Sequence, residues 1–187
     1  MIHIKSKAPS VQDTATQGRF SSSDARMPLA VEQSKLRFAV GIFDTWPRVR
    51  DALRDARERG LVLDTFNCIA FERVFAGKII MAPSQKPVAL QTLPFLEDTE
   101  PIACTSGPLA DCLSERLRAG ARTLKEALGY WLIPRHAGHF EDAVKAGKIL
   151  LWIPVADADK ERDAYQILLA TSSNSVGVHD LVLAGGL

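Results

Sequence analysis

The chain has 187 residues, of which 47% are hydrophobic and 24% are charged. Such a composition is typical of a globular protein and excludes both wholesale disorder and a bundle of membrane helices. With 23 Lys and Arg against 22 Asp and Glu, the net charge is +1. This balance gives no electrostatic reason to expect a nucleic acid or an anionic membrane as a partner.

The cysteines and the apolar runs indicate where in the cell the protein is expected. Cys68, Cys104 and Cys112 are an odd and sparse set, which fits a reducing compartment better than a disulfide framework. The first residues carry charge with no apolar stretch behind them, so we expect no signal peptide. The longest apolar run, residues 149–155, is too short to span a bilayer. We therefore expect a cytoplasmic protein without a membrane span.

Residues 1–34 differ from the rest of the chain. They contain six serines, few large aliphatic residues and no regular apolar spacing, which predicts an irregular N-terminal arm. Residues 35–187 are expected to form a single α+β domain.

A strand–helix–strand unit opens this domain. The apolar run 38–43 predicts a buried strand. The next helix begins after Asp44-Thr45, whose side chains can cap it, and ends at Gly60. Residues 61–71, with β-branched and aromatic side chains, return as a second strand. The apolar residues of the helix recur every three or four positions and form one stripe: Trp46, Val49, Leu53 and Ala56.

The middle of the chain is an insertion, residues 72–147. Residues 71–81 predict extended structure or a hairpin. Residues 83–101 include four prolines, which restricts them to loops and edge strands. Three helices are then predicted, one from about Pro108 to Gly120 and the others over residues 123–132 and 136–145.

A second strand–helix–strand unit closes the chain. Residues 148–155 predict a buried strand, Asp157 or Asp159 can cap a helix that runs to about Thr171, and residues 175–183 predict the last strand. Two such units predict a ferredoxin-like fold: a four-stranded antiparallel sheet with both helices on one face, interrupted by the loop-and-helix insertion.

Both units also carry a resemblance to a known family. The motifs that carry it are Phe38-Ala-Val-Gly-Ile-Phe-Asp, the charged helix that ends at Gly60, Ile133-Pro134, and Ala146-Gly-Lys-Ile-Leu-Leu-Trp-Ile-Pro-Val. On these motifs the chain resembles the bacterial heat-induced general stress protein domain family over about residues 37–72 and 129–181. The family implies a stress-linked role of unknown mechanism and brings no established catalytic residues.

Two histidines have the spacing of a metal-ligand pair. His136 and His139 are three residues apart on a predicted helix, so that both imidazoles lie on one face. A carboxylate from Glu141 or Asp142 is close in sequence. Because zinc sites need three or four ligands, the alternative is that these are two half-exposed histidines in the first turn of a short helix.

Cys104 lies just before the helix that opens with Ser106-Gly107-Pro108. The N-terminus of a helix binds anions and lowers the pKa of a nearby thiol. The sequence thus offers Cys104, Ser106 and Gly107 as a candidate ligand site, with Cys104 as a conceivable nucleophile. His179-Asp180 offers a general base beside an acid, but adjacent strand residues point to opposite faces.

No phosphate-binding glycine motif occurs in the sequence, so we expect no nucleotide or other cofactor. The leading hypothesis is a non-enzymatic protein that acts through self-association, as a homodimer or larger oligomer, or through a partner. The alternative is a small-molecule- or metal-binding enzyme whose pocket is formed by the insertion.

Overall fold

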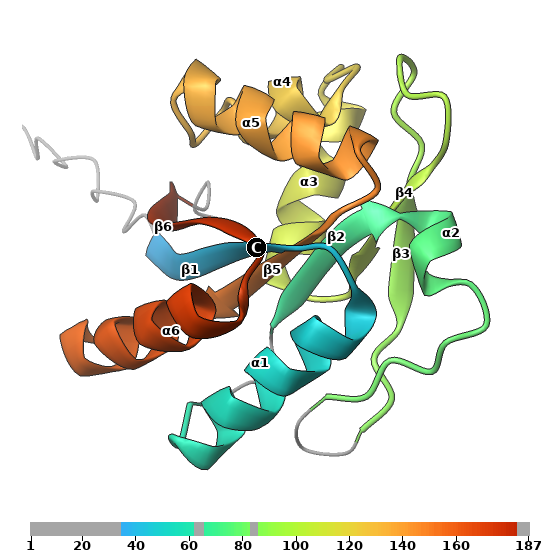
Figure 1. Ribbon diagram of the computed structural model, residues 1–187. Coiled ribbons are helices and arrows are strands. Elements are labelled where there is room, and N and C mark those ends of the chain that lie inside the picture. Colours follow the sequence, from blue (N-terminus) through green and yellow to red (C-terminus); the bar gives the residue numbers. More distant parts are fainter. Residues whose placement is uncertain (1–34, 62–65, 83–85, 183–187) are drawn as a thin grey trace, which may run out of the picture. The chain divides into compact units, whose positions relative to one another are not determined.

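A computed structural model describes residues 35–61, 66–82 and 86–182 (Figure 1). In this part of the chain, six strands form one antiparallel sheet in the order β3-β4-β2-β5-β1-β6. The strands are β1 (Lys35–Phe43), β2 (Asn67–Phe71), β3 (Leu90–Leu93), β4 (Ile102–Thr105), β5 (Ile149–Pro154) and β6 (Asn174–Val182).

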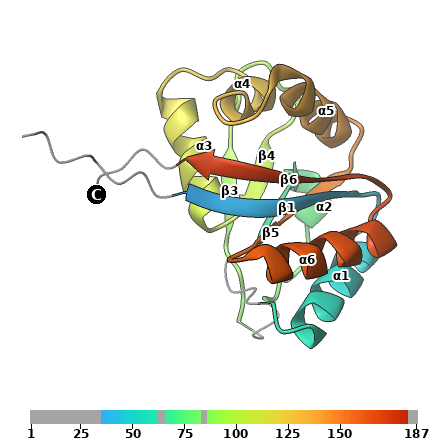
Figure 2. The same ribbon diagram turned by 90° about the vertical axis from the view of Figure 1, so that its left-hand side faces the viewer.

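Helices cover both faces of the sheet (Figure 2). One face carries α1 (Trp46–Glu58) and α6 (Ala158–Thr171), and the other carries α3 (Pro108–Arg118), α4 (Leu124–Leu128) and α5 (Pro134–Lys145). A single turn, α2 (Glu72–Phe75), follows β2. No helix among the residues described is both long enough and apolar enough to cross a membrane.

The two helical layers explain why β1 and β5 are continuous apolar runs. Successive side chains of a strand point to opposite faces. Phe38 and Trp152 therefore pack under α3, α4 and α5, whereas Ala39 and Ile153 pack against α1 and α6. A strand buried on both faces needs apolar residues at every position.

The predicted α+β class is confirmed, and the two strand–helix–strand units share one sheet as expected. They interleave, because β5 lies between β1 and β2 while β1 lies between β5 and β6. The predicted four-stranded ferredoxin-like sheet is wrong, since β3 and β4 of the insertion extend it to six strands. The insertion also places three helices on the second face, which would otherwise expose the apolar side chains of β1 and β5 to water.

Several element boundaries differ from the predictions. The second strand begins only at Asn67, and residues 62–65 lie outside the described residues, as does the predicted arm 1–34. Residues 72–75 form α2 rather than extended structure. The second predicted helix of the insertion ends at Leu128 and the third begins at Pro134, where a first-turn proline costs no hydrogen bond. At the start of α6, Asp157 is the capping residue, because its Oδ1 accepts a bond from the Lys160 N–H at 2.8 Å.

Candidate functional site

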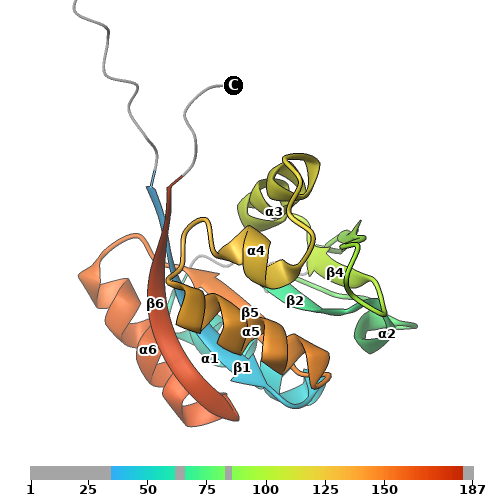
Figure 3. The same cartoon turned by 90° about the horizontal axis from the view of Figure 1, so that it is seen from above.

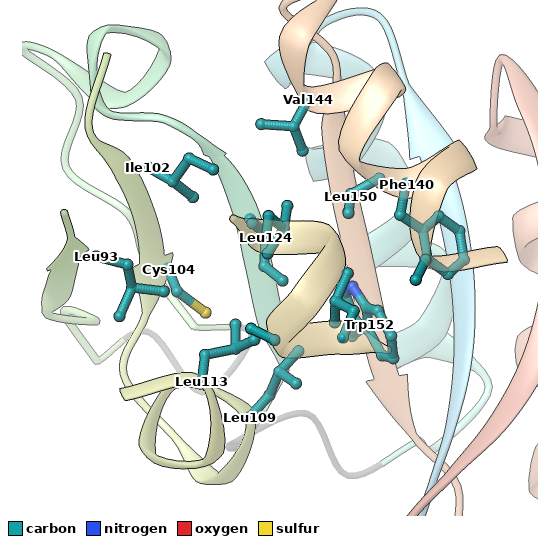
Figure 4. Close-up of a cluster of buried hydrophobic side chains, with 14 of the residues drawn as sticks. Leu93, Ile102, Cys104, Leu109, Leu113, Leu124, Phe140, Val144, Leu150 and Trp152 are labelled. Carbon is teal, nitrogen blue, oxygen red and sulfur yellow. The ribbon is translucent and has the colours of Figure 1, made fainter. Parts of the chain in front are cut away.

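The thiol of Cys104 lies in the core rather than at an open helix end. Cys104 is on β4, fully buried among the apolar side chains between the sheet and α3 (Figure 4). Its Sγ lies 3.4 Å from the Thr105 carbonyl oxygen. Burial, with a smaller contribution from Asp111, raises the pKa of the Cys104 thiol far above its usual range. The thiol is therefore protonated and shielded, which is the opposite of what a nucleophile requires.

Ser106 and Gly107 form the junction between β4 and α3. The Ser106 N–H donates to the Ala89 carbonyl at 2.8 Å, and Gly107 has a φ of 152°. A Cβ at Gly107 would lie 3.0 Å from Nδ2 of the buried Asn67, which donates to the Thr105 carbonyl at 2.7 Å. The Ser106 N–H is therefore already bonded within the protein, and the Asn67 side chain occupies the space beside Gly107.

Histidines from two elements meet instead between α5 and β6. His136 and His139 lie on α5, His179 lies on β6, and all three line a groove of about 610 Å³. The ring centroids of His136 and His179 are 5.3 Å apart with a T-shaped arrangement. We call this site the histidine groove; its lining consists of Arg135, His136, His139, Phe140, Asp142, Ser175, Val176, Gly177, Val178 and His179.

Residues of α5, β5 and β6 surround the His179 ring. Its ring packs against Phe140, at 5.6 Å between centroids, and against Trp152, at 6.2 Å. Its Nε2 lies only 2.9 Å from the position that a Cβ of Gly177 would occupy. Burial lowers the pKa of His179, the nearby His136 lowers it further, and Asp180 partly opposes the shift. His179 is therefore a neutral imidazole at pH 7.

Asp180 does not orient His179. Its Oδ1 accepts a bond from Nη1 of Arg37 at 2.9 Å, and Nε of Arg37 donates to Glu161 of α6 at 2.6 Å. Asp180 thus belongs to the α6 face of the sheet, while His179 faces α5. The expected alternation of strand residues is confirmed, and it separates the base from the acid.

Charged groups at the groove come from α5. Arg135 and Asp142 are both exposed, and neither forms an ion pair with another residue in the described ranges. The first turn of α5 contains no acidic residue, so nothing there offsets the partial positive charge of a helix N-terminus. Within the described part of the chain, no three His, Cys, Asp or Glu side chains are grouped as metal ligands.

The spacing of His136 and His139 predicted a candidate metal-ligand pair, and the structure places both residues at the groove. The sequence did not join them to His179, which comes from a strand 40 residues further along the chain. Comparison of the chain with family models, with curated proteins and with solved structures finds no match.

Proposed function

We propose that this protein is a non-enzymatic binding protein whose histidine groove holds a small anionic ligand with a carboxylate or phosphate group. The observation that carries the proposal is the gathering of Arg135 and three imidazoles at one open groove. A role in a stress response belongs to the proposal and rests on the family resemblance. A cytoplasmic location is supported by the three free thiols.

The chemistry of the groove favours an anion. A guanidinium presents planar N–H donors that match carboxylate and phosphate oxygens, and each imidazole offers a further N–H donor. Arg135 and His136 lie in the first turn of α5, where the helix dipole also favours negative charge. Asp142, the acidic group of the groove, lies two turns further along α5, about 10 Å from Arg135 along the helix axis.

The state of the thiols supports binding rather than covalent catalysis. Burial raises the pKa values of Cys68 and Cys104 strongly, and it raises the pKa of Cys112 to about 11. None of these thiols supplies a thiolate at neutral pH. The enzyme alternative retains one argument, because α5 belongs to the insertion and forms one wall of the groove.

The test is a titration of the full chain with inorganic phosphate and, separately, with succinate, followed by NMR of the histidine ring signals. We expect saturable shifts of His136 and His179 with at least one of the two anions. Arg135→Gln should weaken the binding by about ten- to a hundredfold, because a charge-assisted hydrogen bond contributes about 1.5–3 kcal/mol. Arg48→Gln, on an exposed position of α1, is the matched control and should leave the affinity unchanged.

Two outcomes would overturn the proposal. One is the absence of saturable shifts with both anions, or shifts that Arg135→Gln leaves unchanged. The other is stoichiometric Zn²⁺ binding that is lost in both His136→Gln and His179→Gln while anions have no effect. That result would favour the metal-binding alternative, for which the described residues supply the His136–His179 pair but no third grouped ligand.

A further inference from the structure

The β6 end of the sheet is an open edge. β6 pairs with β1 on one side, and no strand among the residues described pairs with its other side. It is nine residues long and contains neither proline nor lysine, the residues that commonly protect such edges. The opposite edge, β3, has only four residues, with Pro94 directly after it and Pro87 three residues before it. The two ends of the sheet thus differ sharply in their capacity to pair.

Two exposed apolar side chains lie on α6, the helix next to this open edge. Tyr165 and Leu169 are one turn apart on α6 and are 38% and 57% exposed. Figure 3 shows α6 running alongside β6. The helix beside the unpaired backbone of β6 thus carries two exposed apolar side chains.

The contacts of α6 fix which way Tyr165 and Leu169 face. On the flank toward α1, Arg59 binds Gln166 at 3.0 Å and lies 4.0 Å from Asp163. On the flank of Glu161, which reaches Arg37 beside β6, the helical period places Tyr165. Leu169, one turn further, lies between this flank and the side of α6 that faces away from the buried stripe of Ala164, Ile167 and Leu168. Tyr165 therefore points away from α1, toward the open edge of the sheet, and Leu169 adjoins it on the exposed surface of α6.

We propose that a second copy of this chain pairs with the β6 edge, antiparallel and about a two-fold axis perpendicular to the sheet. Such an axis keeps the faces of the sheet in register, so α6 of each copy lies on the same side of the joint sheet. Tyr165 and Leu169 of one copy then meet their counterparts, as in any isologous interface. One arrangement thus satisfies both the unpaired backbone and the exposed apolar pair.

The sequence of β6 is compatible with this pairing. Full overlap of the nine residues places Val178 opposite its own counterpart and Asp180 opposite the counterpart of Val176. Asp180 is the acidic residue of the strand, so like charges do not face each other. The counterpart of His179 falls opposite Gly177, which has no side chain. The histidine grooves of both copies then lie on the same face of the joint sheet. That this face binds anions rests on the proposed function.

The test uses the full chain in sedimentation equilibrium and in hydrogen exchange at several protein concentrations. We expect a mass of twice 20.5 kDa and amides of residues 174–182 that become more protected as concentration rises. The double variant Tyr165→Asp and Leu169→Asp should be monomeric and folded, because both side chains are exposed. Leu96→Asp, at a position that is 79% exposed and outside the proposed interface, is the matched control and should remain dimeric.

Three outcomes would overturn the inference: a monomer at all concentrations, as expected if another part of the chain covers β6; a dimer that survives the double variant; or a dimer without concentration-dependent protection of β6. The anion titration keeps the two proposals apart. A monomeric double variant that still binds phosphate or succinate would support the interface and leave the proposed function intact. A dimeric protein without anion binding would support the interface and overturn the proposed function.

Discussion

His179 folds back over Gly177, so that its Nε2 lies 2.9 Å from the point where a Cβ at position 177 would sit. The imidazole fills space that any other residue at 177 would occupy. Because the obstacle is a side-chain ring rather than backbone, it can rotate away at small cost. Gly177 therefore controls the shape of the histidine groove more than the stability of the fold.

The first prediction follows from this contact. Gly177→Ala should displace the His179 ring, shift its NMR signals and weaken anion binding several-fold. The free energy of unfolding should change by less than about 1 kcal/mol, because the ring can take another rotamer. Gly138→Ala, outside the lining of the groove and with space for a Cβ, is the control. An unchanged His179 spectrum in Gly177→Ala would contradict the contact.

A second prediction concerns pH and stability. The folded-state pKa of His179 is lowered by burial and by His136, so the unfolded chain binds more protons below about pH 6.5. The stability that comes from neutral His179 is present above this pH and is lost as the pH falls through the lowered pKa. Urea unfolding of the wild type and of His179→Phe should diverge between pH 7.5 and pH 5. A constant difference between the two proteins across this range would count against the assignment.

The third prediction concerns Lys145, which joins two buried carboxylates. Its Nζ lies 3.2 Å from Glu141 and 3.7 Å from Asp98. The Asp98 side chain is 1% exposed, and neither of its oxygens has a hydrogen-bond partner among the residues described. Lys145→Met should lower the free energy of unfolding by about 2 kcal/mol at pH 7, because it leaves these charges without a cation.

The loss caused by Lys145→Met should shrink in acid. Burial raises the pKa of Asp98, so its carboxyl takes up a proton at a higher pH than an exposed aspartate does. Below the raised pKa the unpaired charge is gone. Lys148→Met, which breaks the exposed ion pair with Asp44, is the control and should cost less than about 1 kcal/mol. An equal loss of unfolding free energy in the two variants would refute the claim that Lys145 stabilises buried carboxylates.

A fourth prediction tests the packing of α1 on the sheet. Leu53 is buried with Val49 and Ala56 against the sheet. Leu53→Asp should destabilise the fold by several kcal/mol, because it buries an unpaired charge. Leu96→Asp, on an exposed position, should change the free energy of unfolding by less than about 0.5 kcal/mol in chemical denaturation. Similar losses in both variants would mean that Leu53 does not pack as described.

The elements that the sequence predicted well are those whose pattern is local. The continuous apolar runs of β1 and β5 and the stripe of α1 each extend over enough residues to show their period. β3 and β4 have four residues each and lie among prolines, and the pairing of β4 with β2 joins segments more than 30 residues apart. Strands of four residues are too short to show a period of two, and the distant partner of β4 leaves no local signal.

The candidate site shows the same limit. The spacing of His136 and His139 is a property of one helix and was visible in the sequence. The approach of His179 depends on how α5 packs over the sheet, which only the fold determines. Cys104 illustrates the converse, because it does precede a helix as predicted, but the second helical layer buries its thiol.

The short β3 edge limits how large an assembly can grow. A sheet with two open ends could add copies one after another and form a fibre. Here Pro87 and Pro94 bracket β3, and proline has no N–H to donate to a new neighbour. If two copies join through β6, both outer ends of the combined sheet are β3 edges. The joint sheet then stops growing at two copies. The long unpaired edge of β6 thus leads to a closed dimer rather than to aggregation.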